Sequence, residues 1–97
     1  MRRLERLSPA ERDAALAGLP RWRWDGEADA LRREFRFPDF VAAFAFMARV
    51  ALHAEKVDHH PDWSNRWNRV DVRLTTHDAG GVTARDVDFA RVIDGWG

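Results

Sequence analysis

The sequence contains no cysteine, and a single lysine, Lys56, accompanies its arginines. Without cysteine the chain can form neither a disulfide framework nor a thiolate metal site, and the redox state of its compartment stays open. Net charge of one sign is also missing, because 16 Lys and Arg residues balance 16 Asp and Glu residues. A neutral chain lacks the broad positive field that drives non-specific binding to DNA or RNA, so we expect no nucleic-acid partner.

Long apolar runs are absent as well. Near its start the chain reads Leu4-Glu5-Arg6 and not an apolar stretch, so we expect no secretory signal, no membrane-spanning segment and a cytoplasmic location. No repeat, low-complexity tract or linker interrupts the sequence, which predicts a single domain over residues 1–97. A chain this short buries only a modest fraction of its surface when it folds alone, which favours a homo-oligomer.

Capping signals mark the first and the last helix. Ser8 with Glu11 three residues later forms a capping box, and it predicts a helix from about Pro9 to Ala17. Thr83 with Asp86 three residues later predicts in the same way a helix that runs almost to the C-terminus.

Two hairpins are predicted from alternating polar and apolar residues. The first joins residues 21–24 to residues 31–37. The second joins residues 63–67 to residues 70–74 and turns near Asn68. The predicted order is therefore helix, strand, strand, helix, strand, strand, helix. We expect an α+β fold with a four-stranded antiparallel sheet.

The longest helical pattern runs from residue 38 to about residue 55 and is apolar on more than one face. One face carries Phe40, Phe44, Met47, Ala51 and Leu52, and other sides carry Val41, Phe46, Val50 and Ala54. A helix that covers a sheet needs one buried stripe, so the second apolar face predicts either a partner chain or packing by the first helix. We favour the partner chain.

Three of the four histidines lie in two short segments, His59-His60-Pro61 and Thr75-Thr76-His77. Imidazole accepts and donates protons near neutral pH, so two such groups can handle both proton transfers of an addition or elimination of water. By residue type alone the three histidines are equally suited to a zinc site. Pro61 fixes the backbone after the pair, and Asp58 either caps this junction or orients a ring or ligand.

The remaining histidine and the tryptophans have simpler interpretations. His53 lies in the middle of the long helix without a partner motif, so we interpret it as structural. Trp63 stands beside the histidine pair and is predicted to form a wall of the pocket, although sheet packing explains it equally well. Trp22, Trp24 and Trp67 are expected in the core.

The segment 55–70, which contains Glu-Lys-Val-Asp-His-His-Pro-Asp-Trp, and the segment 74–78 closely resemble the signature of the pterin-4a-carbinolamine dehydratases. The similarity extends upstream over residues 35–51 and downstream through Thr83 and Ile93, and so covers nearly the whole chain. The resemblance implies a four-stranded antiparallel sheet with helices on one face, assembled into dimers or tetramers through helices. It also implies loss of water from 4a-hydroxytetrahydropterin to give quinonoid dihydropterin, without a metal or an organic cofactor.

The same resemblance implies site residues. Carried over by position, the catalytic groups are His59, His60 and His77, and the pterin-contacting segments are 58–60 and 75–77. We predict His59 and His77 as the acid/base pair and His60 mainly as a group that holds the substrate. The complete predicted substrate-binding set is Asp58, His59, His60, Trp63, Thr75, Thr76 and His77. Three further residues match family positions near the pocket and are equally well explained as salt bridges or helix caps: Glu55, Arg85 and Asp86.

Two other functions stay open at this point. Animal relatives also stabilise the dimer of a homeodomain transcription factor, so a non-catalytic dimerisation or binding protein is the main alternative. A dehydratase for another pterin, such as one of molybdenum cofactor metabolism, is the second. If the substrate is the spent cofactor of aromatic amino acid hydroxylases, a functional link to such a hydroxylase is expected.

Overall fold

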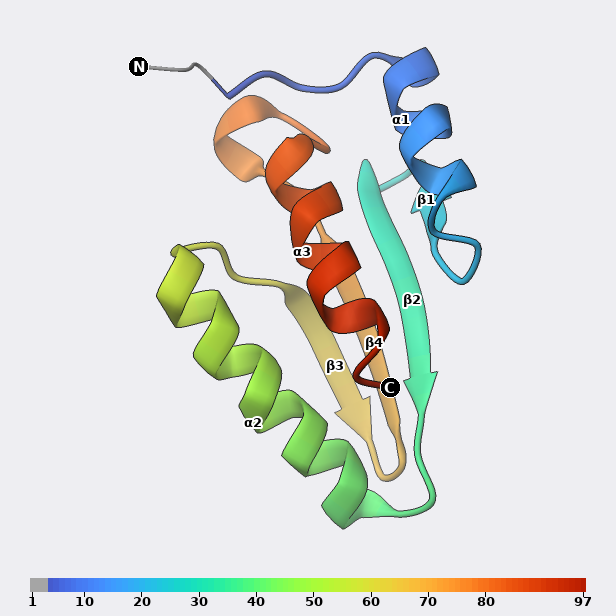
Figure 1. The fold of residues 1–97 in the computed structure, drawn as a ribbon, viewed down its shortest axis with the longest axis vertical. Coiled ribbons are helices and arrows are strands. Elements are labelled where there is room, and N and C mark those ends of the chain that lie inside the picture. The colour runs from blue at the N-terminus through green and yellow to red at the C-terminus, as the bar shows by residue number, and fades with distance from the viewer. Residues whose placement is uncertain (1–3) are drawn as a thin grey trace.

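The structure, a computed structural model, describes residues 4–97. The first three residues, on which the expectation of no secretory signal partly rests, lie outside the described residues. The elements follow the predicted order (Figure 1): α1 (Pro9–Ala17), β1 (Arg23–Asp25), β2 (Ala30–Arg36), α2 (Phe40–Val57), β3 (Asp62–Arg66), β4 (Arg69–Leu74), a 3₁₀ turn η1 (His77–Ala79) and α3 (Ala84–Asp94).

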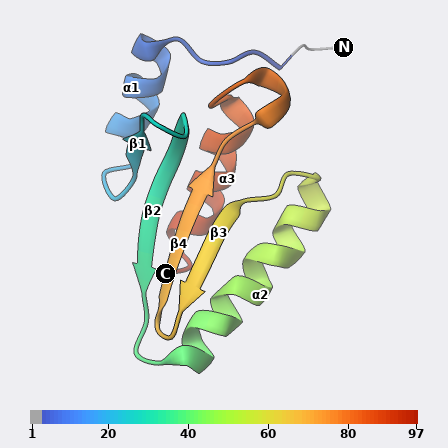
Figure 2. The same cartoon turned by 180° about the vertical axis from the view of Figure 1, so that it is seen from behind.

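The four strands form one antiparallel sheet in the order β1-β2-β4-β3. The three helices lie on the same face of this sheet, and the view from behind leaves the opposite face open (Figures 1 and 2). The predicted α+β class and the order α-β-β-α-β-β-α are therefore confirmed. Both capping boxes are present as predicted, at Ser8 with Glu11 and at Thr83 with Asp86.

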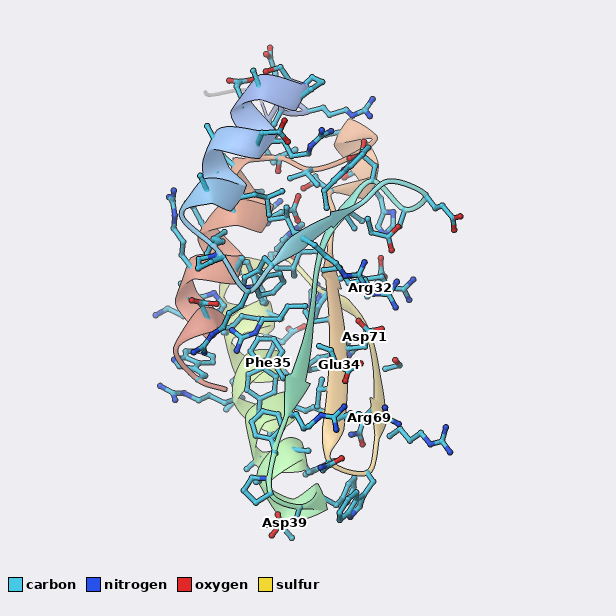
Figure 3. The ribbon with its side chains drawn as sticks, turned by 90° about the vertical axis from the view of Figure 1, so that its right-hand side faces the viewer. Arg32, Glu34, Phe35, Asp39, Arg69 and Asp71 are labelled. Carbon is cyan, nitrogen blue, oxygen red and sulfur yellow. The ribbon has the colours of Figure 1, made fainter. Side chains whose placement is uncertain are left out.

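The core lies between the sheet and the helices. Phe35 on β2 is 1% exposed, and its ring centroid is 4.5 Å from that of Phe46 on α2. Phe35 pairs with Val70 across the strands, which places both side chains on the helix-covered face. On the open face, alternate residues of β2 and β4 are charged, as Figure 3 shows for Arg32, Glu34, Arg69 and Asp71.

The helix α2 begins and ends two residues later than predicted. Asp39 is the N-cap, and its carboxylate accepts a hydrogen bond from the N–H of Ala42 at 2.8 Å. At the other end the helix continues to Val57. It ends there because the next residue, Asp58, is the C-cap and adopts a left-handed conformation with φ of 53°.

One face of α2 is buried and another is open. The buried face consists of Ala43, Phe46, Val50 and Ala54. Large apolar side chains remain exposed on the rest of the helix: Phe40, Val41, Phe44, Leu52 and Val57. The helix α1 does not cover them, because it lies over β1 at the far side of the sheet (Figure 1). Within residues 4–97, no helix has the length and hydrophobicity needed to cross a membrane.

The prediction that Trp22, Trp24 and Trp67 all lie in the core is correct only for Trp22, which is 5% exposed. Trp24 is 37% exposed, and the guanidinium of Arg12 covers its ring at 3.7 Å from the centroid. Trp67 is 63% exposed because it occupies the turn between β3 and β4, with φ of 49°.

Candidate active site

His59 lies immediately after the cap that ends α2. Its N–H donates to the carbonyl of Ala54 at 3.1 Å, so the chain leaves the helix in a fixed direction. The side chain is buried, and its Nε2 lies 2.5 Å from Oδ1 of Asp86 on α3. A carboxylate at this position holds the imidazole in one orientation and one tautomer, which leaves Nδ1 as the nitrogen available to a ligand.

Asp86 is completely buried and belongs to a wider hydrogen-bond network. Its Oδ2 accepts from the N–H of Thr83 at 2.9 Å and from the hydroxyl of Thr76 at 2.8 Å. The hydroxyls of Thr76 and Thr83 are themselves 2.8 Å apart. The capping box of α3 thus connects His59 to the segment that leads into His77.

His60 and His77 are exposed, and each also contacts a carboxylate. Nε2 of His60 lies 2.8 Å from Oε1 of Glu55, and Nε2 of His77 lies 3.1 Å from Oδ2 of Asp62. His77 begins the short turn η1, and the turn is capped by Gly80, whose left-handed conformation with φ of 77° favours glycine. Every histidine of the predicted site therefore has an acidic neighbour.

Arg85 joins the start of α3 to the end of α2. Its Nη2 donates to the carbonyl of Val57 at 2.9 Å and to that of Asp58 at 2.6 Å. These carbonyls have no partner inside their own helix, so the guanidinium satisfies them. The contact fixes the backbone of Val57 and Asp58, the two residues that precede His59 and His60.

Most of the predicted site residues line one cavity of about 240 Å³. It is lined by Asp58, His59, His60, Thr75, Thr76 and His77, together with Asp78 and Arg85. The three predicted catalytic histidines, from two segments far apart in the sequence, therefore share one cavity.

Trp63 lies outside the site cavity, and Thr75 lines it with its hydroxyl already engaged. Trp63 pairs with Val72 and packs against the core, and it borders a neighbouring cavity instead of this one. Thr75 lines the site, but its hydroxyl donates to the carbonyl of Asp29 at 2.8 Å, so its proton is engaged within the protein. His53 does not line the site cavity and packs with its ring edge on Phe89, at 4.9 Å between centroids.

Residues 4–97 contain no group of three or more His, Asp or Glu side chains placed to hold a metal ion. The three histidines of the site each lie beside a different carboxylate, an arrangement that is suited to proton transfer.

The partner carboxylates are the functional residues that sequence reasoning placed least well. Asp86 matched a family position, but its contact with His59 was not predicted, and Asp62 had no assigned role. The one signal in the sequence was the capping box, which fixed Asp86 at the N-terminus of α3 without showing what its second oxygen binds.

Comparison with known proteins decides the family. The family model described as "Pterin 4 alpha carbinolamine dehydratase" matches residues 5–96. The chain belongs to this family.

Its relatives cover almost the whole chain. A protein of Rhizorhabdus wittichii with the name "Putative pterin-4-alpha-carbinolamine dehydratase" is 62% identical over 91 residues, which is 94% of each chain. A protein of Novosphingobium aromaticivorans with the same name is 60% identical over 92% of this chain and 93% of its own.

A solved structure supports the same family. The Brucella melitensis protein described as "transcriptional coactivator/pterin dehydratase" superposes with a TM-score of 0.91 at 47% identity, over 95% of this chain and 98% of that chain. The fold of that protein is thus shared over nearly all of the described chain.

Proposed function

We propose that residues 1–97 act as one catalytic domain, a dehydratase that removes water from 4a-hydroxytetrahydropterin and gives quinonoid dihydropterin. The family membership supports the substrate class, and the shared cavity of His59, His60 and His77 supports the chemistry. The cavity is the single observation that carries the proposal, because it holds all three predicted catalytic groups.

The reaction needs one acid and one base. The C4a hydroxyl becomes a good leaving group only when it takes a proton, and it departs as water when the C4a–O bond breaks. The electron pair that replaces this bond comes from the adjacent ring nitrogen, which forms a double bond to C4a as its own proton is lost. One imidazolium and one neutral imidazole on the two sides of the pterin supply both transfers.

We assign His59 and His77 to these transfers. His59 is held by the buried carboxylate of Asp86. His77 reaches the same cavity from η1, and its Nε2 contacts the carboxylate of Asp62. His60 is exposed and pairs with Glu55, so we assign it to holding the substrate, together with Asp58. Thr76 acts through its hydrogen bond to Asp86, while Thr75 and Trp63 form walls of the binding region.

The proposal is tested with purified protein and a 4a-carbinolamine generated by an aromatic amino acid hydroxylase. Wild type should dehydrate it well above the spontaneous rate. His59→Ala and His77→Ala should each remove at least about 10²-fold of the catalysed rate. The matched control is His53→Gln, which changes a histidine outside the cavity and should retain the activity. Equal rates for wild type and the double variant His59→Ala/His77→Ala would disprove the enzymatic function.

A second candidate function is a binding protein that stabilises a partner through α2. It is favoured by the exposed apolar side chains of that helix and by the Brucella melitensis protein, which is described as a transcriptional coactivator as well as a pterin dehydratase. The same surface serves a homodimer or homotetramer, which we propose as its main use. Turnover of the carbinolamine separates the enzyme from a purely non-catalytic scaffold.

The physiological pterin is either the spent cofactor of an aromatic amino acid hydroxylase or another pterin, such as one of molybdenum cofactor metabolism. The residues that contact the ring serve both. The two candidate pterins differ in the side chain on the ring. If the ring lies among the histidines, this side chain extends out of the cavity past them.

A further inference from the structure

A second cavity adjoins the proposed active site on the open face of the sheet. It has a volume of about 430 Å³, larger than the first, and is lined by Asp62, Trp63, Arg73, Thr75 and His77 among others. Thr75 and His77 border both cavities. A ligand whose ring lies among the histidines can therefore extend a side chain past His77 into the second cavity.

Arg73 is the one arginine or lysine among the residues that line this second cavity, beside the imidazole of His77. Its Nε is buried and has no hydrogen-bond partner within the described part of the chain. Buried polar groups in proteins are nearly always paired, and an unpaired donor costs stability. Across the strands Arg73 faces another cation, Arg32, on one side and Asp62 on the other.

The nearby carboxylates are already engaged by other groups. Asp62 contacts His77, at 3.1 Å, and forms no ion pair with Arg73 within 4 Å. Asp71 and Asp25 both bind Arg32, at 2.6 Å and 3.0 Å, and these contacts raise the pKa of Arg32 above its ordinary value. Figure 3 shows Arg32 and Asp71 side by side on this open face. The positive charge of Arg73 is thus left without an acidic partner among residues 4–97.

We propose that the second cavity binds an anionic side chain of the pterin substrate and that Arg73 is the residue that selects it. The ligand is a pterin whose side chain ends in a phosphate or a carboxylate, since guanidinium groups bind both through paired hydrogen bonds. This inference rests on the proposed function, because it takes the first cavity as the place of the pterin ring. It assigns Arg73 to specificity and not to the chemical step.

The experiment compares stable dihydropterins that share one ring and differ in the side chain. One carries a neutral dihydroxypropyl group, one ends in a phosphate, and one ends in a carboxylate. Binding is measured by calorimetry at low ionic strength, where charge contacts are least screened. Wild type should bind at least one of the anionic ligands about tenfold or more tightly than the neutral ligand. Whichever of the two anionic ligands binds more tightly shows whether the cavity prefers a phosphate or a carboxylate.

Two variants of Arg73 and one control test whether the preference for anionic ligands depends on Arg73. Arg73→Gln removes the charge and should abolish the difference between anionic and neutral ligands, while Arg73→Lys should keep part of it. The control is Arg69→Gln, four residues earlier on the same face of β4 and outside the cavity, which should leave the preference intact.

Several results would overturn the inference. These are equal binding of neutral and anionic ligands by wild type, an unchanged preference in Arg73→Gln, and an equal loss in Arg69→Gln, which would indicate a general charge effect. The proposed function fails separately, when wild type does not accelerate dehydration of the carbinolamine. An anionic preference that depends on Arg73 would still hold in that case.

Discussion

The carboxylate of Asp86 binds the imidazole of His59 with one oxygen, Nε2 to Oδ1 at 2.5 Å, and caps the N-terminus of its own helix with the other. One residue therefore fixes both the fold of α3 and the orientation of a proposed catalytic group. Both side chains are buried, so their contact is weakly screened and the orientation of His59 depends directly on Asp86.

Asp86→Asn separates the two roles. The amide oxygen can still cap α3, while the negative charge beside His59 is lost, so the imidazole is held less well for proton transfer. We expect kcat for dehydration to fall by about tenfold or more with a smaller change in KM. The pH profile of kcat should shift as well, which a purely structural role would not produce. Asp88→Asn, at an exposed position on the same helix, is the control, and an equal loss of kcat there would contradict the assignment.

Much of the fold was predictable because its signals are local. The capping boxes at Ser8 and Thr83 depend on residues three positions apart, and they located α1 and α3 correctly. The end of α2 depends instead on which residue takes the left-handed conformation, and Asp58 does so three residues beyond the predicted end. Local pattern predicts that a helix exists more reliably than where it ends.

The site was less predictable because its contacts are distant in the sequence. His59 and Asp86 are 27 residues apart, and His77 and Asp62 are 15 apart, so their meeting depends on how α2, α3 and the sheet pack. The histidines themselves were identified through family resemblance. For Trp67 the aromatic type suggested burial, but its place in a tight turn exposes it, and periodicity does not report this.

Arg85 is expected to act as a positioning residue. Arg85→Gln shortens the side chain and removes the charge, so the carbonyls of Val57 and Asp58 lose their partner and the segment with His59 and His60 loosens. We expect a loss of about 1 kcal/mol in the free energy of unfolding, measured in urea, together with a lower kcat. Arg85→Lys should restore part of both. A lower stability with unchanged kcat would show that the contact is only structural.

The acidic cluster around Arg32 predicts a dependence of stability on pH. The hydrogen bond from Arg32, and next the one from the N–H of Ala28, hold the pKa of Asp25 below its ordinary value. A lowered pKa in the folded state contributes stability above the unfolded value of about 3.9, and this contribution is lost as the pH falls through the lowered pKa.

Asp25→Asn should therefore be less stable than wild type near neutral pH, and the difference should shrink in acid. Urea unfolding over a pH series checks this. Glu27→Gln, in the same turn, is the control because Glu27 forms no ion pair in the part of the chain that the structure describes. A difference between wild type and Asp25→Asn that stays constant with pH would contradict the role of the Arg32 contact.

The exposed apolar face of α2 predicts self-association. Phe44 is 58% exposed and Leu52 is 74% exposed, and both lie on a helix whose opposite side already packs on the sheet. Exposed apolar side chains gathered on one helix are typical of an interface, and a charge placed there opposes burial. Phe44→Glu and Leu52→Glu should therefore shift the protein toward the monomer, as measured by light scattering during size exclusion. Ser64→Glu, on the exposed open face of the sheet, introduces the same charge and should leave the assembly intact. A wild type that is monomeric at all concentrations would contradict this role of α2.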